Sequence, residues 1–237
     1  MTEDAFDDLS AVSHARRQAS GRPARPRDAA TLILIRPKGT DVLVLMGRRN
    51  DAHTFMPGKW VFPGGRVDRA DFNAPFATDL RPEVAGRLQA ATPVRTVRAL
   101  ALAAIRETFE EVGLLLAKRA PPRPGAGPWR AFLAQGALPD LEALDMIARA
   151  VTPPSAPRRY DARFFMARAS RLISLQRQPD CGELDEIAWV SLRDALDLDL
   201  PSVTRFVLRD IPLRLADPLR PAPYLRFARG RRTLHTL

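Results

Sequence analysis

The stretch Arg106-Glu107-Thr108-Phe109-Glu110-Glu111-Val112-Gly113-Leu114 gives this chain its organisation. It continues the apolar run 99–105, and the two together predict one long helix that ends at the glycine. At about 100° per residue, Glu110 lies about 60° to one side of Glu107 and Glu111 about 40° to the other, so three carboxylates share a helix face. A divalent cation such as Mg²⁺ would relieve their repulsion, and a solvated acidic face is the alternative interpretation.

A second stretch lies upstream, Phe62-Pro63-Gly64-Gly65. With it, the acidic stretch resembles the second half of the Nudix hydrolase box, Arg-Glu-x-x-Glu-Glu-x-Gly followed by an aliphatic residue. The resemblance implies an α/β fold, a Nudix α/β/α sandwich with a mixed central sheet and the acidic helix on one face. It also implies a diphosphatase that depends on Mg²⁺ or Mn²⁺, ions that neutralise phosphoryl oxygens and activate water.

The resemblance also assigns roles to individual residues. The catalytic candidates are Glu107, Arg106 and Glu110, where Arg106 is the cation that steadies the carboxylates and Glu107 is a metal ligand or the base. The metal ligands are Glu107, Glu110 and Glu111. In Nudix proteins a carbonyl of the glycine turn joins the metal shell, which indicates Gly64 or Gly65.

The chain departs from the usual box in the first half. An insertion at about 66–92 separates the glycine turn from the helix, and Arg98 stands where the box has a glutamate, eight residues before its arginine. Asp68 or Asp71 either substitutes for that glutamate or lies on the surface. Thr92 precedes a proline, so we expect it to cap the start of the helix.

Six arginines are candidates for substrate binding, because a guanidinium pairs with phosphate in a bidentate geometry. They are Arg48, Arg49, Arg66, Arg158, Arg159 and Arg163. For the last three, a solvated strand edge is the alternative. Glu183 and Glu186 precede a strand that contains a tryptophan, where some Nudix enzymes place an extra carboxylate, and solvation of a turn is the alternative there.

The rest of the chain predicts a single folded unit behind a short arm. We assign 1–28 to a flexible arm rich in arginine and proline, and 29–237 to the Nudix domain. Apolar runs at 29–35 and 41–46 predict a hairpin, and 160–167 predicts a strand. Helices are expected at 141–147, after Ser191 and at 200–210.

Composition narrows the function classes. The 237 residues carry a net charge of +10, nearly all from arginine, which suits nucleic acid or a small polyanion. Basic patches interleaved with aromatic residues are missing, so we favour the small molecule. No apolar run is long enough for a membrane span, and the single cysteine excludes an internal disulfide. The bias to Arg, Ala and Pro fits a GC-rich bacterial coding sequence and hence the cytoplasm; monomer and homodimer both stay open.

The substrate is predicted from weaker signals. Gly58 to Gly65 is similar to the end of a coenzyme A signature, Gly-x-x-x-Phe-Pro-Gly-Gly. The insertion, Thr152-Pro153 and the stretch 158–165 together resemble the acyl-CoA diphosphatase branch of peroxisomes and its bacterial relatives. That branch implies cleavage of CoA or acyl-CoA to 3′,5′-ADP and (acyl-)4′-phosphopantetheine. The alternatives are a diphosphatase for ADP-ribose or NADH, and a non-catalytic Nudix module that binds nucleotide or RNA.

Overall fold

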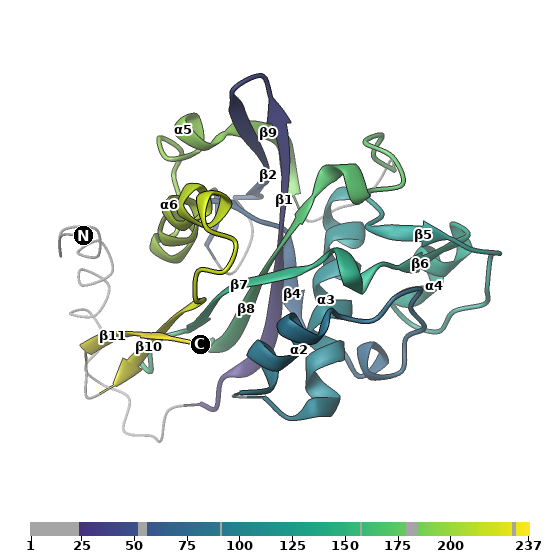
Figure 1. Ribbon diagram of the computed structural model, residues 1–237, viewed down its shortest axis with the longest axis horizontal. Helices are drawn as coiled ribbons and strands as arrows, with labels where there is room; N and C mark the ends of the chain where they lie inside the picture. The colour runs from purple at the N-terminus through teal and green to yellow at the C-terminus, as the bar shows by residue number, and fades with distance from the viewer. Residues whose placement is uncertain (1–23, 52–55, 91, 157, 179–183, 229–230) are drawn as a thin grey trace.

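A computed structural model describes residues 24–51, 56–90, 92–156, 158–178, 184–228 and 231–237. A nine-stranded mixed sheet forms its centre, and helices cover both faces of that sheet (Figure 1). The strands follow the order β11-β10-β7-β8-β1-β2-β3, with β4 paired to β1 and β9 paired to β2. This arrangement confirms the predicted α/β/α sandwich with a mixed central sheet.

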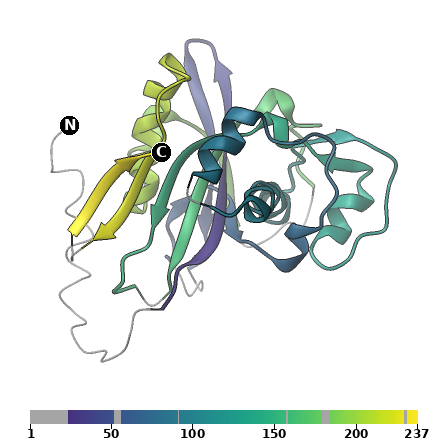
Figure 2. The same cartoon turned by 60° about the horizontal axis from the view of Figure 1, so that its bottom comes forward.

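The strands of the main sheet are β1 (Arg27–Lys38), β2 (Asp41–Arg49), β3 (Trp60–Val61), β4 (Gly64–Arg66), β7 (Asp145–Val151), β8 (Tyr160–Arg168), β9 (Leu184–Ser191), β10 (Pro223–Ala228) and β11 (Arg231–Thr236). A separate two-stranded sheet contains β5 (Ala117–Arg119) and β6 (Ala137–Pro139). The α-helices are α2 (Pro82–Gln89), α3 (Val94–Val112), α4 (Trp129–Ala134), α5 (Leu192–Ala195) and α6 (Ser202–Ala216). Figure 2 shows the yellow β10–β11 hairpin at one end of the sheet, away from α3.

The hairpin of β1 and β2 is confirmed, and its side chains build both cores. Side chains alternate between the faces of a strand. Leu32 and Leu34 therefore pack into the core that contains α3, whereas Ile33 and Ile35 pack into the core that contains α6. Because β1 is buried on both faces, its sequence is a continuous apolar run and does not alternate with polar residues.

The acidic helix is α3, and its end is as predicted. Gly113 adopts φ 69° and ψ 23° and caps the helix in the left-handed conformation, which glycine adopts without steric cost. The prediction for its start is wrong in detail. The N-cap is Pro93 without a side-chain hydrogen bond, because the Thr92 hydroxyl instead accepts a hydrogen bond from Nη2 of Arg163 at 2.7 Å.

The helix predicted at 141–147 is also wrong. A 3₁₀ turn, η3 (Leu141–Ala143), leads directly into β7, which lies between β8 and β10. Met146, Ile147 and Ala148 are each 1% exposed, because cores cover both faces of this strand. A short apolar run of this kind has the same periodicity signal in a buried strand and in a buried helix.

The insertion folds onto α3. It contains a 3₁₀ helix, η2 (Arg69–Phe72), followed by α2. Val84 and Leu88 of α2 join the same core as α3, so hydrophobic burial fixes the insertion beside the acidic helix.

The predictions for the strand at 160–167 and for the last two helices agree with the structure, whereas most of the arm predicted at 1–28 lies outside the described residues. Ser191 caps α5, where its hydroxyl accepts from the Asp194 amide at 3.0 Å, and the predicted terminal helix is α6. The first strand begins at Arg27, two residues before the boundary that we assigned to the folded domain. Among the described residues, no helix has the length and apolar character needed to cross a membrane.

Candidate active site

The site is built around one buried guanidinium. Nε of Arg106 donates to Oδ1 of Asp71 at 2.8 Å, and Nη2 donates to Oδ2 of the same carboxylate at 2.9 Å. Asp71 is fully buried in η2 and also accepts from Nε1 of Trp129 at 3.0 Å. This bidentate pair with a third donor fixes the position of the guanidinium on α3.

The same guanidinium holds two of the predicted carboxylates. Nη1 of Arg106 donates to Oε1 of Glu107 at 2.9 Å and to Oε2 of Glu110 at 2.7 Å. Its Nη2 also donates to the carbonyl of Arg66 at 2.9 Å. Arg106 therefore steadies both carboxylates and joins them to the end of β4.

The glycine turn lies directly against the acidic helix. The amide of Gly64 donates to Oε2 of Glu111 at 2.8 Å. A Cβ at Gly65 would lie 2.3 Å from the carboxyl carbon of Glu107, and a Cβ at Gly64 would lie 2.5 Å from the carbonyl oxygen of Ala30. A side chain at Gly64 would meet the backbone of β1, so that position requires glycine, whereas a side chain at Gly65 would displace the carboxylate of Glu107.

Burial changes the proton affinity of the acidic side chains. It raises the pKa of Glu107 and of Glu110, although the charge and hydrogen bonds of Arg106 oppose the shift in both. For Arg106, burial favours the neutral form, but the hydrogen bonds with Asp71 and the charges of Glu107, Asp71 and Glu110 outweigh it and raise the pKa. Arg106 is therefore a permanent cation beside carboxylates that bind protons more tightly than exposed glutamates do.

This arrangement corrects part of the electrostatic reasoning from the sequence. Arg106 lies between Glu107 and Glu110, so a cation of the chain itself already relieves their repulsion. Within the described ranges, no three His, Cys, Asp or Glu side chains lie close enough together to hold a metal ion as they stand. The donor types still fit a hard divalent ion, because Arg106 uses one oxygen of each glutamate and leaves the second oxygen of each outside the ion pair.

Known proteins have a similar fold and a related sequence. A crystal structure of a NUDIX hydrolase from Alicyclobacillus acidocaldarius covers 81% of this chain, and the match covers 96% of that chain, with 29% sequence identity and a TM-score of 0.62. The chain belongs to the Nudix hydrolase superfamily. No protein-family model matches the chain.

Two curated Nudix relatives match part of the sequence. An acyl-coenzyme A diphosphatase, NUDT19, from Gallus gallus is 36% identical over 124 residues, which are 43% of this chain and 33% of the relative. A putative nudix hydrolase 7 from Caenorhabditis elegans is 26% identical over 185 residues, 72% of this chain and 53% of the relative. The chain thus spans between a third and about half of the length of these relatives.

The structure separates the six arginines that we predicted as substrate ligands of this Nudix domain. Arg66 is exposed at the end of β4. Its carbonyl accepts from Arg106, but its neighbour Gly65 faces Glu107, so the Arg66 side chain lies on the opposite face of the sheet. Arg49 is half-buried at the end of β2 and Arg158 is exposed before β8. Arg159 donates to the carbonyl of Ala24 at 2.8 Å, so its guanidinium binds the backbone.

The placement of Arg163 does not fit substrate binding and corrects that prediction. Its side chain is 3% exposed and donates from Nη1 to Oδ1 of Asp28 at 2.8 Å and from Nη2 to the hydroxyl of Thr92 at 2.7 Å. The sequence around an arginine on a strand does not show whether its side chain extends into solvent or pairs with a buried carboxylate. Here it joins β8 to β1 and to the start of α3.

Arg48 and Glu186 lie opposite each other on β2 and β9. Their neighbours Leu45 and Ile187 pack toward α3, so the alternation of side chains places Arg48 and Glu186 on the other face of the sheet. The structure therefore does not bring Glu186 together with Glu107, and the extra carboxylate predicted there is not at the acidic helix. Glu183 lies outside the described residues.

The sequence does not predict the contacts of two residues of the site, Asp71 and Trp129. Asp71 is buried against Arg106, so the alternative that it lies on the surface is wrong, whereas Asp68 is exposed and caps η2. Trp129 was missed. It follows a loop and binds Asp71, 58 positions away, so no local pattern could reveal the contact.

Proposed function

We propose that this chain hydrolyses the diphosphate linkage of a nucleoside diphosphate derivative, with CoA or acyl-CoA as the first candidate. One observation carries the proposal: Arg106 forms ion pairs with Glu107 and Glu110, and these carboxylates lie close to the glycine turn at Gly64 and Gly65. A module that only binds nucleotide would not require such a set, because buried carboxylates are costly unless they are used.

The preference for CoA is supported by the relative from Gallus gallus, whose name is acyl-coenzyme A diphosphatase and which is 36% identical over part of the chain. The net charge of +10, with arginine as the main cationic residue, suits a ligand with several phosphates. In the proposed reaction, water attacks one phosphorus of CoA and the bond to the bridging oxygen breaks. The products are 3′,5′-ADP and 4′-phosphopantetheine, or its acyl derivative.

Each residue of the set has a defined part in this reaction. Glu107, Glu110 and Glu111, with a carbonyl of Gly64 or Gly65, would hold Mg²⁺ or Mn²⁺. The metal supplies charge neutralisation at the phosphoryl oxygens and activation of the attacking water. Burial makes Glu107 a stronger base than an exposed glutamate, which suits it to accept a proton from water. Arg106 holds Glu107 and Glu110 at a fixed spacing.

A substrate panel tests the proposal. CoA, an acyl-CoA, ADP-ribose and NADH are incubated with the protein and Mg²⁺ or Mn²⁺, and the products are separated and identified by mass. We expect 3′,5′-ADP from CoA, and loss of turnover in Glu107→Gln. Exclusive turnover of ADP-ribose or NADH would establish the other diphosphatase class, and no turnover of any compound would leave a module that binds nucleotide or RNA.

A further inference from the structure

Both carboxylate oxygens of Asp71 have two hydrogen-bond donors. Oδ1 accepts from Nε of Arg106 at 2.8 Å and from Nε1 of Trp129 at 3.0 Å. Oδ2 accepts from Nη2 of Arg106 at 2.9 Å and from the amide of Asp68 at 2.7 Å. A carboxylate has about four lone-pair positions, so each of them is occupied. The Asp71 side chain is 0% exposed, so water cannot replace a donor that is lost.

These donors come from three parts of the chain. Asp68 caps the same 3₁₀ turn that contains Asp71, and Arg106 belongs to α3. Trp129 brings in a third element, α4, because it lies 58 positions further along the sequence than Asp71. The indole N–H therefore ties α4 to the buried ion pair of the site.

Aromatic packing fixes the direction of this indole. Trp129 is 2% exposed, and its ring meets Phe132 edge to face, with the ring centroids 5.2 Å apart. Phe132 in turn meets Phe109 of α3 edge to face at 5.3 Å. Phe109 lies between Glu107 and Glu110 in the sequence. The helix α4 is thus joined to the acidic part of α3 by aromatic rings as well as by the indole hydrogen bond.

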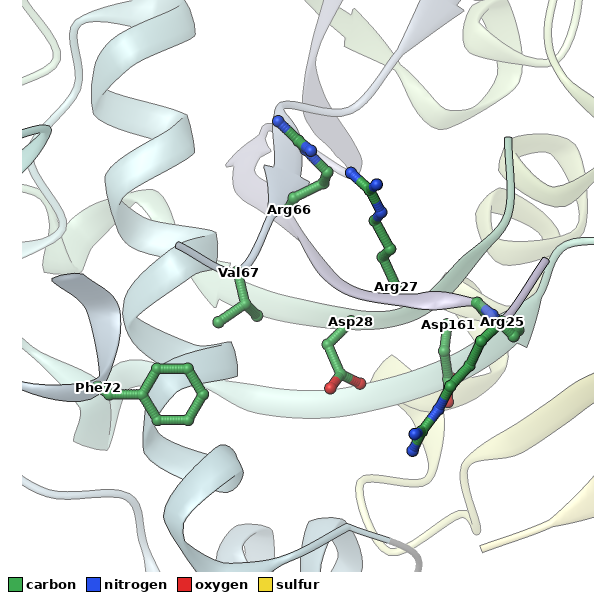
Figure 3. Close-up of a pocket in the computed structure, with 8 residues that line it drawn as sticks. Arg25, Arg27, Asp28, Arg66, Val67, Phe72 and Asp161 are labelled. Carbon is green, nitrogen blue, oxygen red and sulfur yellow. The ribbon is translucent and has the colours of Figure 1, made fainter. Parts of the chain in front are cut away.

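A neighbouring pocket shows which side of this region a ligand can reach. It has a volume of about 520 Å³, and Val67 and Phe72 extend toward it on one side of β1, whereas Arg66 extends to the other (Figure 3). Asp71 precedes Phe72 but is fully buried, and Trp129 does not line the pocket. Because Trp129 is buried too, it cannot contact a substrate. Any effect of its N–H on the reaction must therefore pass through Asp71.

We propose, on the basis of the proposed function, that Trp129 is a positioning residue for the diphosphatase reaction. Its N–H holds the carboxylate of Asp71, which holds the guanidinium of Arg106. Nη1 of that guanidinium binds Glu107 at 2.9 Å and Glu110 at 2.7 Å and so sets the spacing of the two carboxylates. The indole therefore acts on the rate of hydrolysis and not on the binding of the substrate.

Trp129→Phe removes the donor and keeps an aromatic ring beside Phe132. We expect kcat for the best substrate of the panel to fall by about tenfold or more at saturating Mg²⁺, with KM unchanged, because outer partners of metal ligands usually have effects of this size. Replacement of Trp129 by 3-benzothienylalanine, in which sulfur takes the place of the N–H group, should lower kcat equally. That side chain keeps the shape of the indole and tests the donor even if Trp129→Phe folds poorly.

Phe132→Leu is the matched control, because it disturbs the same aromatic packing and leaves the indole donor in place. It should lower the melting temperature and keep full kcat. Equal losses of kcat in Trp129→Phe and Phe132→Leu, or full kcat with 3-benzothienylalanine, overturn the positioning role. Either outcome leaves the diphosphatase proposal intact, because the wild type still hydrolyses its substrate.

The Asp71→Asn background tests whether the effect passes through Asp71. Two residues that act through one contact have effects that do not add. Once Arg106 has lost its carboxylate partner, Trp129→Phe should lower kcat by much less than it does in the wild type. A further loss of the same factor in this background overturns the proposed route.

If the wild type hydrolyses nothing in the panel, the proposed function fails, and Mn²⁺ binding tests Trp129 separately. Electron paramagnetic resonance measures the free Mn²⁺ in a titration of each protein. We expect Trp129→Phe to bind Mn²⁺ about tenfold more weakly than the wild type, and Phe132→Leu to keep the wild-type affinity. Equal affinity in all three proteins overturns the positioning role.

Discussion

Asp71 holds Arg106 through two hydrogen bonds, at 2.8 Å and 2.9 Å, although 35 positions separate the two residues in the sequence. Their side chains are 0% and 4% exposed, so water does not compensate either charge. Asp71→Asn keeps the shape of the side chain and removes its charge. We expect a loss of about 3–5 kcal/mol in the free energy of unfolding, because a buried guanidinium loses its partner.

Urea denaturation measures this loss, and Asp79→Asn is its control. Asp79 also pairs with an arginine of α3, Arg98, but the two side chains are 45% and 58% exposed. A surface pair of this kind contributes about 0–1 kcal/mol. Equal and small losses in both variants would contradict the structural role of the buried pair.

Gly65 limits how the acidic helix approaches β4. In Gly65→Ala the new methyl group would lie 2.3 Å from the carboxyl carbon of Glu107, so that side chain must move. We expect turnover to fall by about 100-fold, the usual effect of displacing a catalytic group by about 1 Å. Steady-state kinetics on CoA measures it.

Gly86→Ala is the control for this substitution. Gly86 lies within α2, and a Cβ there has no neighbour within 4 Å. It should gain about 0.5–1 kcal/mol in stability, since alanine is favoured over glycine in a helix, and it should keep full activity. Full activity in Gly65→Ala would show that the contact with Glu107 has no part in catalysis.

The parts of this site that the sequence reveals are those set by local spacing. The order of Glu107, Glu110 and Glu111 along one helix, and the glycine that ends it, follow from the geometry of α3. The contacts of Asp71 and Arg163 do not, because their partners lie 35 and 135 positions away. A short polar side chain carries no local signal of whether folding will bury it.

The same limit explains the errors in the fold. A buried strand and a buried helix can have the same short apolar run, so the sequence of β7 predicts a helix where the structure has a strand. Thr92 has the residue type and position of a helix cap, yet a buried arginine from β8 uses its hydroxyl instead. In each case a tertiary contact overrides a correct local preference.

The proton affinities of Glu107 and Glu110 make a prediction about stability and pH. Burial raises both pKa values above the ordinary value of about 4.3. The folded state then binds protons more tightly than the unfolded state. Stability from these two groups is therefore fully present below about pH 4.3 and is lost as the pH rises through their folded pKa values.

The double variant Glu107→Gln/Glu110→Gln should not show this loss. Thermal melts without metal, from about pH 4 to 8, compare the two proteins. We expect the melting temperature of the variant to rise relative to the wild type as the pH increases. A constant difference across this range contradicts the raised pKa values, whereas the opposite trend would mean that Arg106 dominates over burial.

Arg163→Met tests whether Arg163 supports the fold or binds substrate. Methionine keeps much of the side-chain volume but removes the donors to Asp28 and Thr92. We expect a loss of about 1–3 kcal/mol in the free energy of unfolding, the range for a buried polar group left without its partner, and an unchanged KM for CoA. Arg158→Gln is the comparison, because Arg158 is exposed and its loss should change stability by less than about 0.5 kcal/mol. A stable Arg163→Met with a raised KM would restore the substrate role that burial argues against, because a guanidinium that holds the fold together cannot be removed without loss of stability.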